Sequence, residues 1–131
     1  MAIRTIVLLM IASSPAIAPP DLFVSKLDDL SGPDAVDCSL KGEEPTDLAR
    51  SLECVKSASA NSKPFKAIIG VNCPDCSFWI GAAGTSTGEF WHVVYDSNPN
   101  GSASDKPRLS IDRCSKLHLD EDGFPFIVCI P

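Results

Sequence analysis

The sequence of 131 residues has little positive charge, and this limits the partners that it is expected to bind. It contains 11 Lys and Arg residues against 17 Asp and Glu residues, which gives a net charge of -6. Nucleic-acid binding depends on a basic patch or stripe, so we expect no nucleic-acid partner. The acidic residues are spread along the chain rather than gathered in runs, a pattern that favours solubility and singles out no partner by charge.

Long apolar runs are also missing, since a bilayer-spanning helix needs about 20 apolar residues. The apolar run Ile6–Ile11 is too short, and it lies between Arg4 and the small-x-small sequence Ala16-Ile17-Ala18. This order is typical of a signal peptide, which we predict over residues 1–18. We therefore expect a secreted or periplasmic protein with no membrane anchor.

Sequence motifs of known catalytic and metal sites give no clear match either. Residues 84–88 fit the pattern Gly-x-Ser-x-Gly, but we expect them to form a hairpin turn rather than the strand-to-helix turn of a hydrolase nucleophile, and the sequence contains no phosphate-binding loop. His92 and His118 stand alone, without the Cys or His neighbours at regular spacing that a zinc site needs. The acidic segment 118–123 lacks the length and ligand alternation of a calcium-binding EF-hand loop. We expect no catalytic residue, no metal and no cofactor.

Six cysteines are present, and all of them lie after the predicted signal peptide. An even number in a small exported chain indicates disulfides. Six cysteines allow fifteen pairings, of which we predict two structural bridges and one local bridge. The structural bridges each join a loose segment to a regular one. The three predicted pairs are Cys38–Cys54, Cys114–Cys129 and Cys73–Cys76.

The first half of the exported chain contains one clear helix. Residues 19–44 show no sustained periodicity, so we expect an N-terminal arm with at most one short helical turn, ended by the sequence Ser-Gly-Pro-Asp at 31–34. Residues 45–58 carry Leu48, Leu52 and Val55 at helical spacing, with Thr46 as the expected N-cap. This apolar stripe is narrow, so the helix has to be held by packing on a sheet.

Residues 65–96 predict a three-stranded meander. If residues 73–76 form a tight turn, positions that sum to 149 lie opposite each other in the first hairpin. The apolar pairs 71–78, 69–80 and 67–82 then share one face, as a half-buried sheet requires. The second turn spans 84–88. A turn with an odd number of residues puts Phe90, His92 and Val94 on that same face, whereas an even number reverses the third strand, and the sequence leaves both open.

Two further strands are predicted, over residues 108–113 and 125–130, with a loop over 117–122 between them. The predicted fold class is α+β. One N-terminal helix packs on a four- to five-stranded, mostly antiparallel meander sheet stabilised by disulfides, and residues 45–131 form a single domain.

The motif Cys73-Pro74-Asp75-Cys76 resembles the active sites of thioredoxin-like and glutaredoxin-like proteins. The segment 61–76 resembles the helix, Lys-Pro, strand and CxxC that lead into that site, and residues 123–126 resemble its cis-proline strand. The resemblance implies a thiol–disulfide oxidoreductase that uses Cys73 and Cys76, with Cys73 at the N-terminus of a helix that lowers its pKa. However, the three glycines among residues 77–88 favour a hairpin, in which this bridge only staples a turn.

Three aromatic residues are the strongest candidate binding site. With an odd second turn, Trp79, Trp91 and Tyr95 share the other face of the sheet with Gly70 and Gly81. An open aromatic patch of this kind marks a binding surface, whereas ordinary packing over the glycines, or a cover formed by residues 19–38, would bury it. We therefore expect a monomeric, non-enzymatic binding or inhibitor-like module for an unknown protein or small ligand, with the oxidoreductase as the alternative.

Overall fold

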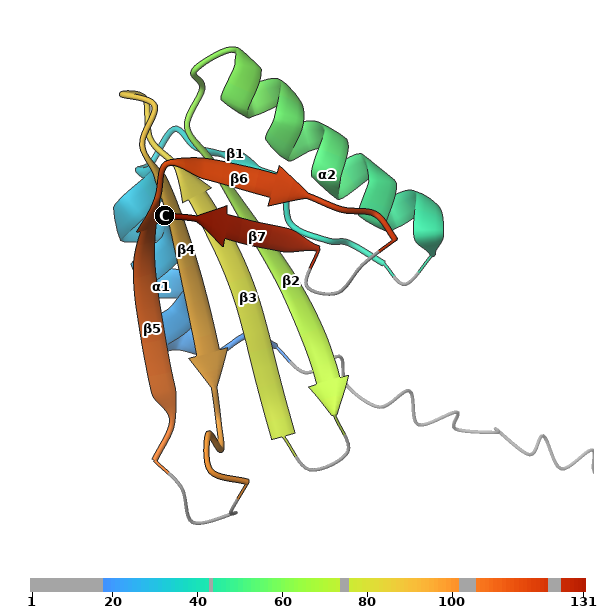
Figure 1. Ribbon diagram of the computed structural model, residues 1–131, viewed down its shortest axis with the longest axis vertical. Coiled ribbons are helices and arrows are strands. Elements are labelled where there is room, and N and C mark those ends of the chain that lie inside the picture. The colour runs from blue at the N-terminus through green and yellow to red at the C-terminus, as the bar shows by residue number, and fades with distance from the viewer. Residues whose placement is uncertain (1–17, 43, 74–75, 102–105, 123–125) are drawn as a thin grey trace, which may run out of the picture.

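The computed structural model describes residues 18–42, 44–73, 76–101, 106–122 and 126–131, and over 70–73 and 76–77 only their backbone. The signal peptide predicted over residues 1–18 lies outside this part of the chain except for Ala18. In the described residues, a twisted five-stranded sheet carries one helix on one face. A second helix and a two-stranded sheet lie on the other face (Figure 1).

The strands of the large sheet lie side by side in chain order. They are β1 (Val36–Asp37), β2 (Phe65–Cys73), β3 (Cys76–Gly84), β4 (Phe90–Asp96) and β5 (Arg108–Cys114). The short β1 runs parallel to β2, and every later pair is antiparallel. The predicted α+β class with a mostly antiparallel meander is confirmed.

The register of the two hairpins is the one that the apolar pattern predicts. In the first hairpin Ala67 lies opposite Ala82 and Ile69 opposite Ile80. In the second, Gly84 lies opposite Phe90, so the turn contains an odd number of residues. The turn closes through a hydrogen bond of 2.9 Å from the Thr85 N–H to the Glu89 carbonyl. His92 and Val94 therefore share the face of Ile80 and Ala82. Of the two turn lengths that the sequence left open, the odd one is present.

Helix α2 (Pro45–Ala60) confirms the predicted helix and continues it by two residues. Its N-cap is Glu44 rather than Thr46, because Glu44 and Asp47 form a capping box around a helix that starts with Pro45. Buried side chains of α2, namely Leu52, Val55 and Ala58, pack with Phe65, Ala67 and Ile69 of β2. This is the main hydrophobic core.

Helix α1 (Asp21–Ser31) corrects the prediction of a loose arm over residues 19–44. Phe23 and Leu27, one helical turn apart, are fully buried against the sheet. This packing stabilises a helix that the sequence pattern alone only weakly indicates. The helix ends at Gly32, which has a positive φ of 85° and donates a hydrogen bond of 2.9 Å to the Asp28 carbonyl.

The C-terminal part forms the two-stranded sheet β6 (Lys116–Leu119) and β7 (Ile127–Ile130), which crosses the α2 side of the large sheet (Figure 1). The loop predicted over residues 117–122 is wrong at its start, because Leu117 and Leu119 alternate and pack on the main core. The predicted final strand is present from Ile127, whose side chain is fully buried.

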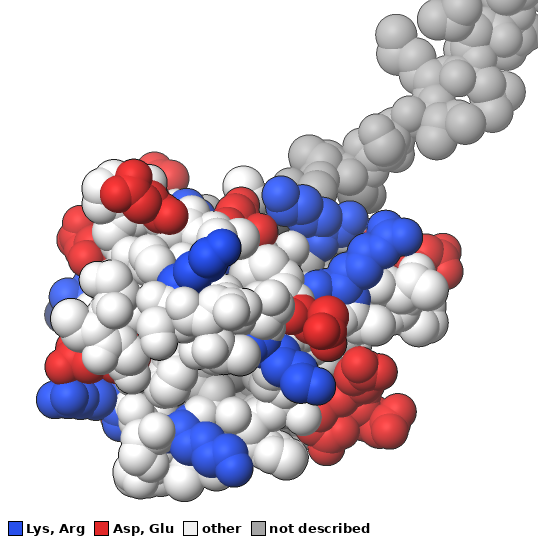
Figure 2. Space-filling model, turned by 90° about the horizontal axis from the view of Figure 1, so that it is seen from above, with Lys and Arg blue, Asp and Glu red and all other residues white. Residues whose placement is uncertain are grey.

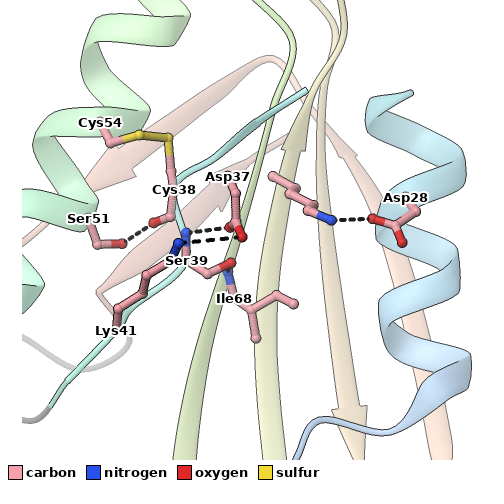
Figure 3. Close-up of polar contacts among 9 residues, drawn as sticks. Asp28, Asp37, Cys38, Ser39, Lys41, Ser51, Cys54 and Ile68 are labelled. Carbon is pink, nitrogen blue, oxygen red and sulfur yellow. Dashed lines mark hydrogen bonds and ion pairs between the residues drawn. A yellow bond between two sulfur atoms is a disulfide. The ribbon is translucent and has the colours of Figure 1, made fainter. Parts of the chain in front are cut away.

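Two of the three predicted disulfides are described, and both are confirmed. Cys38–Cys54 joins the segment after β1 to α2, and Cys114–Cys129 joins the end of β5 to β7. The first lies within a polar network in which the Ser51 hydroxyl donates to the Cys38 carbonyl (Figure 3). Residues 38 and 40 also donate backbone hydrogen bonds to β2. No helix in the described part of the chain is long and apolar enough to cross a membrane.

Candidate functional site

The aromatic face of the sheet forms as the sequence predicts. Trp79 on β3 lies opposite Tyr95 on β4, and Ala83 lies opposite Trp91. The three aromatic residues therefore come from two neighbouring strands and share one face, on the side away from α2. Gly81 lies between Trp79 and Ala83 on the same strand, so this face has a notch in its middle.

Helix α1 fills that notch, so the aromatic face is not open as a whole. A methyl group added at Gly81 would lie 2.5 Å from Leu27 Cδ1 and 2.9 Å from Phe23 Cζ, which means that the helix touches the glycine directly. Beneath the helix Trp79 retains only 8 % of its exposure, and its indole Nε1 has no hydrogen-bond partner. Of the two alternatives that the sequence left open, the cover formed by residues 19–38 is therefore the one present at Trp79, which belongs to the core.

The part of this face along β5 is less covered. The contacts of α1 lie mainly on β2, β3 and β4, and Trp91 and Tyr95 remain half-buried. On β5 they lie opposite Arg113 and Leu109, and Ile111 between these two keeps 36 % of its exposure. We call Trp91, Tyr95, Leu109 and Ile111 the edge strip. Of the aromatic residues predicted for binding, Tyr95 thus lies opposite the apolar Leu109 of β5, and Trp91 lies diagonal to Ile111.

The edge strip borders an open edge of the sheet. Within the described part of the chain, β5 is the last strand of the large sheet and pairs only with β4. Seven consecutive residues of β5 pair with β4 without a bulge, so the opposite side of this regular strand carries hydrogen-bonding groups that no strand among the described residues takes up. The other edge, β1, is a strand of two residues. The long free edge is therefore β5.

A groove opens on the other face of the same strand pair. It has a volume of about 450 Å³ and is lined by His92, Asp112, Arg113, Pro131 and three residues of β7. His92 lies opposite Asp112 in the β4–β5 ladder. Arg113 points to Glu89, with 2.8 Å between its Nη2 and Glu89 Oε1. By register the Asp112 side chain lies on the face of the groove, whereas the Arg113 side chain starts from the other face, so the groove has one charged group among largely apolar walls.

The surroundings of His92 shift the pKa of its imidazole. Burial lowers the pKa of His92 below its ordinary value, although the Asp112 carboxylate and a hydrogen bond with the backbone of Ile127 act in the opposite direction. Its Nε2 atom is buried and has no hydrogen-bond partner. A buried nitrogen of this kind is not accessible to a ligand in the groove, so His92 contributes to packing beneath β7 rather than to a binding site.

The CxxC motif lies at the tip of the first hairpin. The backbone of Cys73 ends β2 and lies opposite Cys76, which begins β3. The third predicted bridge, Cys73–Cys76, lies outside the described residues because their side chains are not described. The strand after Cys76 contradicts the helix that the thioredoxin-like resemblance implies, so the helix dipole that would lower the pKa of Cys73 is missing at this position.

Charge does not single out another site. Among the described residues, no group of three or more His, Cys, Asp or Glu side chains lies close enough together to hold a metal ion. Figure 2 shows basic and acidic side chains interspersed with broad uncharged areas on the face seen from above. The edge strip beside β5 is therefore the candidate functional site.

Comparison with known proteins adds no further assignment. No protein family, no curated protein and no solved structure matches this chain. The sequence pattern indicated Trp91 and Tyr95 as site residues but gave no such indication for Leu109 and Ile111. The alternation of residues 108–113 indicated a strand, but a pattern within one strand does not show that the strand lies at an edge.

Proposed function

We propose that this chain is an exported, non-enzymatic binding module that accepts an extended protein segment along the free edge of β5. The observation that supports this proposal is the edge strip, an apolar surface of Trp91, Tyr95, Leu109 and Ile111 that borders unpaired backbone groups. Trp and Tyr side chains are enriched at protein interfaces because they combine a large apolar area with a polar group.

The mode of binding follows from the geometry of a sheet edge. An added strand gains affinity from backbone hydrogen bonds and specificity from alternate side chains. On one face the added segment meets Leu109 and Ile111, and on the other it meets Arg108, Ser110 and Asp112. A matching segment therefore alternates apolar residues with polar or charged residues.

Export is part of the proposal. The two described disulfides are of the kind that forms in an oxidising compartment, and residues 1–18 carry the pattern of a signal peptide. Together they support a secreted or periplasmic module. An inhibitor that adds a strand to its target would use the same surface.

Selection of displayed peptides tests the proposal even though the natural partner is unidentified. A random peptide library is selected on the purified exported chain, and the recovered peptides are measured on two variants. Ile111→Glu places a charge in the edge strip, and Ile130→Glu makes the same change at an exposed position of β7 with 40 % exposure. We expect binding to Ile111→Glu to be weaker by about tenfold or more, as for an interface anchor. Equal binding to both variants would contradict the proposal.

A further inference from the structure

We infer that the segment accepted by the β5 edge is β5 of a second copy of this chain. The two strands run antiparallel about a two-fold axis through Ser110, so that the two five-stranded sheets become one continuous sheet. This inference rests on the proposed function, since it names the occupant of the same edge. It replaces the monomer that the sequence led us to expect.

Symmetry restricts the possible registers. A two-fold axis perpendicular to the sheet keeps both α1 helices on the same side, so each residue lies opposite a residue of its own face. The numbers of any two residues that lie opposite each other must therefore have an even sum. The axis passes through Leu109, Ser110 or Ile111 if most of β5 is to be paired.

Among these three positions of the two-fold axis, the pairing of charged side chains favours Ser110. With the axis at Ser110, Arg108 of each copy lies opposite Asp112 of the other, which makes two pairs of opposite charge. With the axis at Ile111, Ser110 lies opposite Asp112 and Arg108 lies opposite the disulfide-bonded Cys114. With the axis at Leu109, the proline at 107 lies opposite Ile111. Charged residues usually protect a sheet edge from pairing, but here their positions match under symmetry.

The apolar side chains of β5 match in the same register. Leu109 of each copy lies opposite Ile111 of the other, on the face that carries the edge strip. Directly opposite side chains in an antiparallel pair are about 4.5–5.5 Å apart at Cβ, close enough for both apolar pairs to make contact. Ile111, which is 36 % exposed in the single chain, thereby gains an apolar neighbour, and the two edge strips become continuous. One register thus satisfies both faces of the strand.

Charge reversal tests the inference directly. Arg108→Glu places a second carboxylate opposite Asp112, and Asp112→Arg places a second guanidinium opposite Arg108, so each variant alone has two like-charge pairs. We expect sedimentation equilibrium to show a dimer for the wild type and a dissociation constant at least about tenfold higher for each variant. An equimolar mixture of the two variants restores opposite charges at both pairs, and we expect it to form a heterodimer.

Matched controls separate this effect from net charge. Lys56→Glu and Glu53→Arg make the same changes of charge at exposed positions of α2, and both should leave the dimer unchanged. Near-ultraviolet circular dichroism checks that each variant is folded. Should one of the variants fail to fold, the cysteine variants below still decide the question.

A cysteine at the axis gives an independent result. Opposite residues of an antiparallel pair have Cα atoms about 4.5–5.5 Å apart, within the range of a disulfide. We therefore expect Ser110→Cys to form a covalent dimer on mild oxidation. Asp112→Cys, on the same face but two residues from the axis, should form far less. Peptide mapping confirms that Cys114–Cys129 stays intact.

The failures of the two proposals are distinguishable. A wild-type chain that stays monomeric at all concentrations, or a dimer unaffected by both charge reversals, would overturn the second copy as occupant. Displayed peptides that still require Ile111 would in that case leave the strand-binding function standing. Peptides that bind independently of Ile111 would contradict the proposed strand-binding function, whatever the oligomeric state.

Discussion

Leu27 of α1 lies so close to Gly81 of β3 that a methyl group on the glycine would be 2.5 Å from Leu27 Cδ1. Such a contact leaves no room between helix and sheet, and both Leu27 and Phe23 are fully buried. The N-terminal helix is therefore part of the core rather than a loose arm. Its position decides which part of the aromatic face remains available for binding.

Substitution of Gly81 tests this contact. We expect Gly81→Ala to lower the free energy of unfolding by about 1–3 kcal/mol, because the added methyl group forces Leu27 and Phe23 to move in a packed core. Leu27→Ala should cost about 2–5 kcal/mol. The control is Leu22→Ala on the same helix, where the side chain is 62 % exposed and the change should stay within about 0.5 kcal/mol. Urea unfolding measures all three. Equal effects at Leu22 and Leu27 would contradict the packing of α1.

Replacing each of the two tryptophans by alanine should lower the free energy of unfolding by different amounts. Trp79 is 8 % exposed under α1, so Trp79→Ala should cost about 3–5 kcal/mol. Trp79→Phe should cost much less, because it keeps a ring and removes the indole N–H that has no partner. Trp91 is half-buried, and Trp91→Ala should cost clearly less than Trp79→Ala. Iodide quenching of the remaining tryptophan in each Phe variant gives a second measurement, with Trp91 quenched more strongly. The reverse order would place the open part of the face elsewhere.

Much of the sheet was predictable because the relevant information lies within adjacent segments. The apolar identity of residues 67, 69, 80 and 82 fixed the first register, and the second needed only the number of residues in a turn. Helix α1 was harder to predict, since its stability depends on two side chains, Phe23 and Leu27, that meet a glycine far along the chain. Dependence on segments outside the local sequence also explains why the candidate site was only partly predictable. Trp91 and Tyr95 were recognised by residue type, but only the strand order shows that they lie beside a free edge.

Acidification should destabilise the fold through His92. Its pKa is lowered in the folded chain, so between about pH 6.5 and the lower folded value the unfolded chain binds more protons. The free energy of unfolding therefore decreases as the pH falls through this window. We expect His92→Gln to show a flatter dependence between about pH 7.5 and about 5.5. The reference protein and the His92→Gln variant both carry His118→Gln as well, so that His92 is the single imidazole of the reference protein. Identical slopes in the two proteins would show that His92 is not responsible.

The disulfides should act as independent structural bridges. Replacing Cys38 and Cys54 by serine should lower the free energy of unfolding by about 3 kcal/mol, from a closed loop with a sequence separation of 16. Replacing Cys114 and Cys129, separated by 15 residues, should have a similar effect and should also release β7. Peptide mapping under non-reducing conditions should also find Cys73 joined to Cys76. A bridge from Cys73 to a distant cysteine would contradict this scheme.

The central claim is that the free edge of β5 binds an extended strand, and amide hydrogen exchange tests it most directly. The rates are compared for the monomeric chain, at a concentration below that of its self-association, and for its complex with a peptide selected from the displayed library. We predict slower exchange for alternate residues of β5, since only every second amide of an edge strand points outward to an added strand. Slower exchange confined to α1 or β7, with the rates of β5 unchanged, would contradict the account.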